Sequence, residues 1–135
     1  TAKRPNPLSG HLKHYITKDA SRNVAKAYDQ LSSRAKDAKE SHLDYELIGQ
    51  IGTHSLLKVN PITGRPHQIR VQLAKIDCPI RGDVKYGFPS PNDDGSIHLH
   101  CRSLAFEHPT LKKEIEITAD PPRDQFWDLF KSNWD

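Results

Sequence analysis

The pattern of hydrophobic and polar positions predicts a pair of strands near the start of the chain. Residues 10–17 alternate between side chains suited to a core and side chains suited to solvent, which is the period-2 pattern of a half-buried strand. A polar turn at residues 18–23 leads to a second short strand at residues 24–28. Residues 1–10 show no periodicity and contain two prolines and a closing glycine, so we expect a linker there.

Two longer strands are predicted in the middle of the chain. Residues 43–51 and 54–59 are rich in branched and aromatic side chains, and only Gly52 and Thr53 separate them. Such a short connection favours a hairpin. The preceding segment, residues 32–42, is polar and charged, and we expect an exposed loop there despite its helix-like content of Ala, Lys and Glu.

A helix is predicted to follow this hairpin. Ile69, Leu73 and Ile76 recur at helical spacing, so they define a face that points into a core. Pro66 suits the first helical position, where its missing N–H costs nothing, and Thr63 could cap the start.

The opposite face of the predicted helix has an unusual composition. His67, Arg70, Val71 and Ala74 lie on it, so small apolar residues flank one guanidinium. Arg70 has no acidic residue within a helical turn to pair with. An arginine in such a place is usually directed at a group outside its own helix.

The last third of the chain predicts a loop, two strands and a helix. Residues 82–95 are rich in Pro, Asn, Asp and Gly and predict the loop, residues 96–106 and 113–118 predict the strands, and residues 124–133 predict the helix. The aromatic residues of this helix, which we expect in a core, are Phe126, Trp127 and Phe130.

Together these elements predict an α+β fold with a mostly antiparallel mixed β-sheet and two main helices. The length of 135 residues fits one domain. The 20 Lys and Arg residues exceed the 17 Asp and Glu residues by three, a mild excess that is compatible with an RNA partner. No apolar run is long enough to span a bilayer. The two cysteines, Cys78 and Cys101, are expected to be reduced thiols in a cytoplasmic protein.

Three motifs in the second half of the chain resemble a known family. The run TGRPHQIRVQLAKIDCPIRGDVKYG, residues 63–87, resembles the RluA-type pseudouridine synthase signature, in which T-G-R-x-H-Q-[IL]-R-V precedes P-I-x-G-D-x-x-Y-G. Residues 97–109, IHLHCRSLAFEHP, are similar to the later L-H…L-x-F-x-H-P segment of that family.

The resemblance implies the C-terminal part of a catalytic domain that converts uridine to pseudouridine in structured RNA, either ribosomal or transfer RNA. The family's reaction needs no cofactor or metal, and the target base is flipped from its stack. The resemblance also implies that Arg70 is a catalytic residue that pairs with the family's catalytic Asp. An acid of this chain paired with Arg70 would contradict that role.

The catalytic Asp and Tyr of the family are expected to lie outside these 135 residues. The sequence contains no H-R-L-D run, and Lys26-Ala27-Tyr28 lies too close to the T-G-R segment to be the family's K-x-Y motif. The chain also contains no methionine. We therefore expect a C-terminal fragment, inactive by itself, that exposes apolar surface and self-associates where the first half of the domain would pack.

Two further residues of the motif are candidates for substrate binding. Arg65 and His67 could contact RNA phosphates or bases, or His67 could make a helix-start hydrogen bond while Arg65 lies in solvent. Asp83 and Tyr86 are expected to shape the loop after the helix rather than to catalyse.

A metal site is not expected. His98 and His100 would share one face of a strand while Cys101 points to the other, and this arrangement does not close a tetrahedral site around zinc, even with Cys78 as a distant fourth ligand.

One alternative function comes from a different class of protein. An RNA-binding module without catalysis would explain the basic charge and the missing Asp, but not why a motif that positions a catalytic carboxylate is present. A scaffold without any nucleic-acid role is a third possibility.

Overall fold

A computed structural model describes residues 1–33 and 35–134 of the chain, and the backbone forms two units. The first unit spans Thr1–His98 and the second begins at Leu99. The first unit carries the helix with Arg70 that the sequence predicts, so it is the unit that positions the candidate site.

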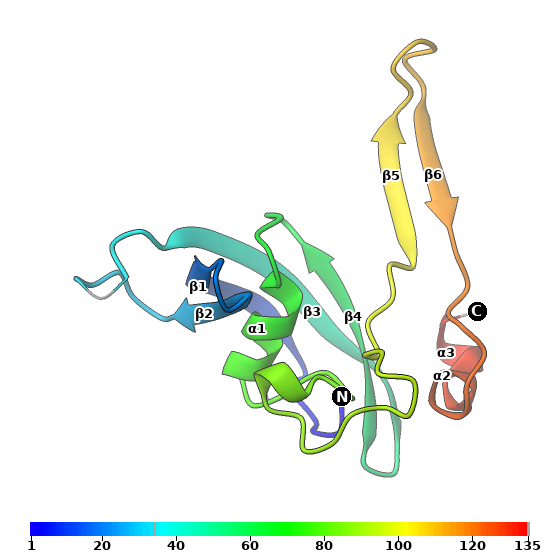
Figure 1. Cartoon of the computed structure of the whole chain (residues 1–135). Coiled ribbons are helices and arrows are strands. Elements are labelled where there is room, and N and C mark those ends of the chain that lie inside the picture. The colour runs from blue at the N-terminus through cyan, green and yellow to red at the C-terminus, as the bar shows by residue number, and fades with distance from the viewer. Residues whose placement is uncertain (34, 135) are drawn as a thin grey trace. The chain divides into compact units, whose positions relative to one another are not determined.

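A four-stranded antiparallel sheet forms the frame of the first unit (Figure 1). Its strands are β1 (Ser9–Asp19), β2 (Val24–Tyr28), β3 (Lys39–Ile51) and β4 (His54–Pro61), in the order β2-β1-β3-β4. The predicted hairpin is confirmed, since β3 pairs with β4, and the two strands predicted before it pair with each other as β1 and β2. The turn between β3 and β4 uses Gly52 at a φ of 59°, a conformation that glycine adopts without steric cost.

The predicted loop at residues 32–42 is wrong at its C-terminal end, because β3 already begins at Lys39. Glu40 and His42 are the solvent-side residues of an alternating pattern in which Ser41 and Leu43 are fully buried. The charged composition hid this strand: Glu40 and His42 lie on the outer face, and β1 supplies the backbone hydrogen bonds.

The N-terminal segment contains no helix or strand up to residue 8, but it is packed rather than free as a linker would be. Thr1 and Ser55 exchange backbone hydrogen bonds of 2.8 Å in both directions. Leu8 accepts another from the backbone N–H of Leu47 at 2.8 Å. The segment therefore pairs with both strands of the β3–β4 hairpin.

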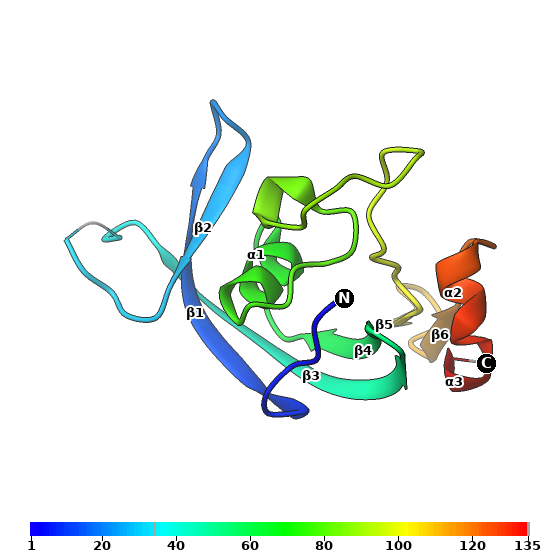
Figure 2. The same ribbon diagram turned by 90° about the horizontal axis from the view of Figure 1, so that it is seen from below.

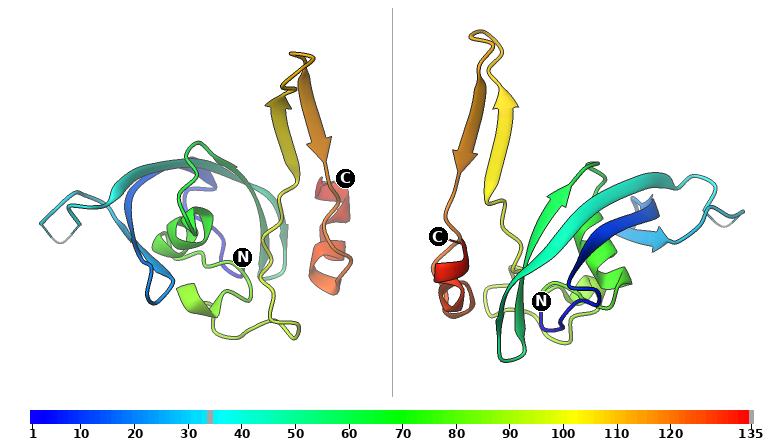
Figure 3. Two further views of the ribbon diagram at one scale, coloured as in Figure 1. Left: turned by 45° about the horizontal axis from the view of Figure 1, so that its top comes forward. Right: turned by 180° about the vertical axis from the view of Figure 1, so that it is seen from behind.

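Helix α1 (Gln68–Lys75) lies inside the curve of the sheet (Figures 2 and 3). Leu73 is buried as predicted, but the face assigned to the site is buried as well, because Val71 packs against Ile16, Ala25 and Ala27. The sheet wraps around the helix and covers two of its sides. The core therefore also reaches Val71, which the sequence places on the face opposite the predicted core face.

The start of α1 also differs from the prediction. The helix begins after His67, which has a left-handed φ of 56° and caps with no side-chain hydrogen bond. The Gln68 side chain organises this turn instead, since its Oε1 accepts hydrogen bonds from the Thr63 hydroxyl (2.8 Å) and the Arg65 N–H (3.0 Å). Thr63 thus helps to hold the turn without capping the helix, and Pro66 precedes the helix rather than opening it.

The segment after α1 is a loop with one short 3-10 helix, η1 (Val84–Tyr86). The strand predicted at residues 96–106 begins only at Ser103, so the prediction is wrong for residues 96–102. Here the backbone of His98 bonds to Arg81 O at 3.0 Å, and no strand ladder forms in residues 96–102.

The second unit is a hairpin followed by two short helices. Strands β5 (Ser103–Glu107) and β6 (Glu114–Thr118) pair antiparallel, and α2 (Gln125–Leu129) and α3 (Lys131–Trp134) replace the single predicted helix. One face of the hairpin is apolar, because Leu104 pairs with Ile117 and Phe106 with Ile115; Leu104, Phe106 and Ile117 are all exposed. Of the aromatic residues predicted in a core, only Phe130 is buried, while Phe126 and Trp127 are half-buried.

Two expectations about the whole chain can be compared with the described residues. Cys78 is a buried free thiol and Cys101 an exposed one. None of the helices in residues 1–33 and 35–134 is long and apolar enough to cross a membrane.

Candidate functional site

The candidate site is built around a bidentate ion pair between Arg70 of α1 and Asp83 of the following loop. Arg70 Nε donates to Asp83 Oδ2 and Arg70 Nη2 donates to Asp83 Oδ1, both at 2.8 Å. The Asp83 side chain is only 1% exposed and that of Arg70 is 20% exposed. The hydrogen bonds from Arg70 to Asp83 raise the pKa of the guanidinium, so Arg70 is a fixed cation in the site.

This pair contradicts one prediction directly. Arg70 was expected to find its carboxylate outside the chain, and the structure pairs it with an acid 13 residues away in the same chain. The expectation that Arg70 has no internal acid is therefore wrong. The pair also counts against the role stated for Arg70 above, so any role toward an outside carboxylate has to rest on the part of the guanidinium that Asp83 does not use. The sequence predicts a loop-shaping role for Asp83, and the signal that connects it with Arg70 is its place in the G-D-x-x-Y-G segment beside the Arg70 motif.

The geometry of the pair leaves part of the guanidinium available. A guanidinium has five N–H donors in a fixed planar fork, and Asp83 uses the side edge formed by Nε and Nη2. Within the described residues, no hydrogen bond satisfies Nη1 of Arg70. The end of the fork, Nη1 with the second N–H of Nη2, can therefore bind another carboxylate or a phosphate bidentately.

Tyr86 supports Arg70 from one side. The Arg70 Cζ lies 4.9 Å from the Tyr86 ring centroid, within the range of a cation–π contact. The Tyr86 hydroxyl accepts a hydrogen bond from the Ala25 N–H at 2.8 Å and lies 2.6 Å from His67 Nδ1. Arg70 is thus held by an acid on its edge and by an aromatic ring on its face.

The structure brings His67 to the same place through Tyr86. Because the Tyr86 hydroxyl accepts from Ala25, the arrangement that uses every group has Tyr86 donating its proton to His67 Nδ1, which leaves the other proton on Nε2. Burial lowers the pKa of His67, and the charge of Arg70 lowers it further. His67 is accordingly a neutral imidazole with an N–H donor at Nε2.

Arg65 lies apart from this group. Its Nε and Nη2 donate to the backbone carbonyl of Glu40 in β3, at 3.3 and 3.0 Å. Of the three residues predicted for the site, the structure therefore joins Arg70 and His67 through Tyr86 and turns Arg65 toward the sheet.

A sharp turn places Asp83 against Arg70. Gly82 has a φ of 84°, and a Cβ at this position would lie 2.5 Å from Asn92 Nδ2. The Asp83 N–H donates to Ile80 O at 2.9 Å, and Asp83 O accepts from the Phe88 N–H at 3.0 Å. The turn needs glycine for both its conformation and its space, and it fixes the carboxylate at its end.

The histidine-rich segment near residue 100 forms other contacts. His98 Nδ1 lies 2.9 Å from Asn92 Nδ2, His100 Nε2 lies 2.9 Å from Ala119 O, and Cys101 Sγ bonds to Ser103 O. Among residues 1–33 and 35–134, no three His, Cys, Asp or Glu side chains are grouped so as to hold a metal ion.

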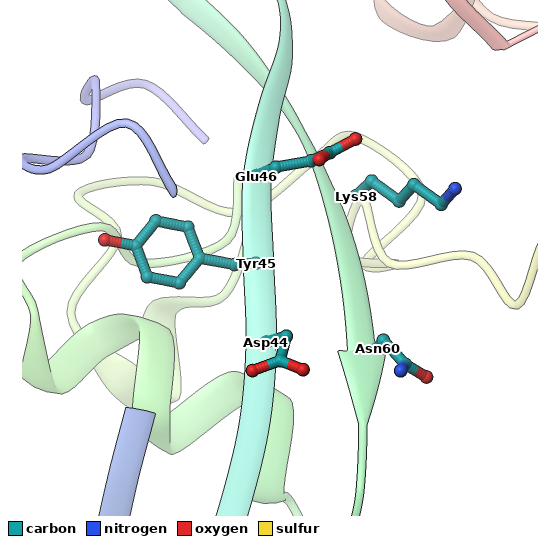
Figure 4. A pocket seen from close by; sticks show the side chains of 5 residues that line it. All are labelled: Asp44, Tyr45, Glu46, Lys58 and Asn60. Carbon is teal, nitrogen blue, oxygen red and sulfur yellow. The ribbon is translucent and has the colours of Figure 1, made fainter. Parts of the chain in front are cut away.

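A shallow hollow elsewhere in the first unit is not part of this site. Figure 4 shows that Asp44, Glu46, Lys58 and Asn60 project from β3 and β4, with Tyr45 directed the other way. Tyr45 is buried and donates to Pro7 O at 2.8 Å. The hollow is therefore lined by exposed side chains of both charges on the outer face of the sheet.

Comparison with known proteins gives matches in sequence. The profile of a family described as RNA pseudouridylate synthase matches residues 1–75. The ribosomal large subunit pseudouridine synthase C of Buchnera aphidicola is 32% identical over 123 residues, which cover 80% of this chain and 39% of that protein. The tRNA pseudouridine synthase C of Haemophilus influenzae is 34% identical over 112 residues, which cover 70% of this chain and 47% of that protein.

Solved structures give matches in fold. Human RNA pseudouridylate synthase domain containing 4 aligns with a TM-score of 0.66 and 25% identity, over 90% of this chain and 55% of that one. Human RNA pseudouridylate synthase domain containing 1 shares the fold with a TM-score of 0.65 and 23% identity. The chain thus spans about half, or less, of the proteins that it matches.

Proposed function

Because this chain belongs to the RluA-type pseudouridine synthase family, we propose that it forms the Arg70-bearing part of an enzyme that isomerises uridine to pseudouridine in RNA. The observation that carries the proposal is the half-used guanidinium of Arg70. Asp83 binds Nε and Nη2 of the guanidinium, and the Tyr86 ring lies against its face. These contacts fix the orientation of the remaining edge, which Nη1 and the second N–H of Nη2 form.

In the proposed reaction, the bond between N1 of uracil and C1′ of the ribose breaks, the ring turns, and C5 bonds to C1′. C5 then loses its proton to solvent, N1 gains one, and the composition of the nucleotide is unchanged. We propose that the free edge of Arg70 binds a catalytic carboxylate supplied from outside these 135 residues. That pairing keeps the carboxylate ionised and fixes its direction toward the target nucleotide.

The substrate is proposed to be structured RNA, ribosomal or transfer, in the cytoplasm. His67 offers its Nε2–H to a phosphate or to a base carbonyl, and Arg65 adds a cation near the sheet. The proposed chemistry uses no cofactor. We also propose that the 135-residue chain is inactive without the part that supplies the carboxylate.

The test is pseudouridine formation by the product of the complete reading frame that contains this chain. RNA transcripts labelled with tritium at C5 of uridine are incubated with the wild type and with Arg70→Ala, and released tritium is counted. We expect release with the wild type and a loss of several orders of magnitude with Arg70→Ala. Arg123→Ala is the matched control: Arg123 pairs with Asp128 in the second unit, and its loss should retain turnover.

RNA binding without any tritium release by the wild type would contradict the proposed function. That result would favour the alternative, a non-catalytic RNA-binding module. This alternative is supported by the absence of an H-R-L-D run from the 135 residues.

A further inference from the structure

The tip of the β1–β2 hairpin is fastened to the segment that carries Asp83 and Tyr86. Lys85 Nζ donates to Asn23 O at 3.1 Å, and the Ala25 N–H donates to the Tyr86 hydroxyl at 2.8 Å. These two bonds join strand β2 and its turn to η1 across about 60 residues of sequence. The β1–β2 hairpin is therefore held next to Tyr86, whose ring contacts Arg70.

Lys18 lies on the face of this hairpin that packs against α1. In the β1–β2 register Lys18 is opposite Ala25, and Ile16 is opposite Ala27. Directly opposite residues of an antiparallel pair share a face, and Ile16, Ala25 and Ala27 are buried against Val71 of α1. Lys18 is the next residue on this face beyond the core, and it is exposed.

The charges around His67 show that cations converge here. Burial lowers the pKa of His67 most, the charges of Arg70, Lys18 and Lys85 lower it further, and Asp83 acts in the opposite direction. Asp83 is already bonded to Arg70 at two positions.

The acid nearest in sequence to Lys18 is also engaged elsewhere. Asp19 accepts hydrogen bonds from Ser21 and pairs with Arg22 at 3.0 Å. The surface formed by Lys18, His67 and Lys85 is therefore positive, and Asp83 and Asp19 are paired with Arg70 and Arg22.

We propose that this lysine surface, defined as Lys18, Lys85 and the Nε2–H of His67, binds a phosphodiester of the RNA backbone next to the target uridine. The proposal rests on the proposed function and adds the residues that hold the substrate backbone. A flipped nucleotide must be held by its flanking phosphates, because stacking is lost. Lysine ammonium groups suit this task as point charges, and a neutral imidazole adds one directional hydrogen bond.

The experiment measures RNA affinity of the complete reading-frame product over a series of salt concentrations. Lys18→Ala and Lys85→Gln each remove one charge, and the glutamine keeps a donor for Asn23 O. Each should weaken binding about fivefold at low salt and reduce the slope of log affinity against log salt by about 0.7 to 0.9. Lys85→Arg should restore the slope.

Lys26→Ala is the matched control. Lys26 lies on the same hairpin but alternates with the buried Ala25 and Ala27, and its Nζ is 5.5 Å from the Tyr28 ring. It should leave the slope unchanged. A thermal melt of each variant separates loss of charge from loss of fold.

Equal slopes for wild type, Lys18→Ala and Lys85→Gln would overturn the proposal, as would an equal loss in Lys26→Ala, or no RNA binding by the wild type. The proposed function is judged separately by tritium release. Wild-type release with unchanged lysine slopes would refute this surface alone, and binding that depends on the lysines without release would refute the isomerase alone.

Discussion

Removing either partner of the Arg70–Asp83 pair should destabilise the first unit strongly. Loss of one partner leaves the other charge without compensation, which costs about 3–5 kcal/mol for a buried pair. Asp83 is 1% exposed but Arg70 is 20% exposed, so a stranded guanidinium regains some hydration. We therefore expect the lower end of that range, about 3 kcal/mol, for Asp83→Ala. Arg70→Ala should cost more, because it strands the fully buried carboxylate.

A double-mutant cycle measures the coupling itself. Arg70→Ala, Asp83→Ala and the double variant are unfolded with urea and followed by circular dichroism. With an m-value of about 2 kcal/mol/M, each single variant should lower the midpoint by about 1.5 M or more. The double variant should be less destabilised than the sum of the singles by about 2 kcal/mol.

Additivity within about 0.5 kcal/mol would refute the account of this pair. It would mean that Arg70 and Asp83 do not stabilise each other in solution, and the fixed direction of the guanidinium would have no basis. Arg65→Ala serves as the control, since Arg65 contacts a backbone carbonyl and no acid. It should shift the midpoint only slightly.

Three other perturbations have defined outcomes. Gly82→Ala should destabilise the fold by more than about 1 kcal/mol, because its φ is 84° and its new Cβ would lie 2.5 Å from Asn92; Gly64→Ala, which has open space, should be nearly neutral in the same urea titration. Burial lowers the pKa of His14, so the unfolded state binds more protons and stability should fall as the pH drops below about 6.5; His14→Asn should flatten this dependence, and an identical pH profile would refute it. Leu104→Lys on the exposed apolar hairpin should reduce self-association in sedimentation velocity, whereas a wild type that is monomeric at every concentration would contradict the expectation.

Local periodicity was sufficient to find the strands of the four-stranded sheet because the buried residues of each lie on one face. The alternation in residues 10–17 and in the first part of 43–51 follows a more buried and a more exposed side of each strand, and the Gly52 turn fixes the hairpin. Residues 39–42 escaped prediction because their polar side chains all suit solvent. Only the pairing with β1, which is not local, makes them a strand.

The partner of Arg70 could not be derived from periodicity. Asp83 reaches Arg70 through a turn at Gly82 with positive φ and through a side chain, Asn92, that closes over that turn. Such a contact depends on loop geometry rather than on helical spacing. The motif resemblance placed Arg70 and Asp83 in one signature, and that was the available signal that the two act together.

The most direct test of the central claim is the single-turnover rate of pseudouridine formation by Arg70→Lys in the complete reading-frame product, at saturating RNA. Lysine keeps the charge but has no planar fork, so it cannot hold Asp83 on one edge and a second carboxylate on the other. We predict that RNA affinity stays within about twofold of the wild type while the rate falls at least a hundredfold. A lysine variant that converts uridine at the wild-type rate would contradict the claim that the free edge of Arg70 serves the reaction.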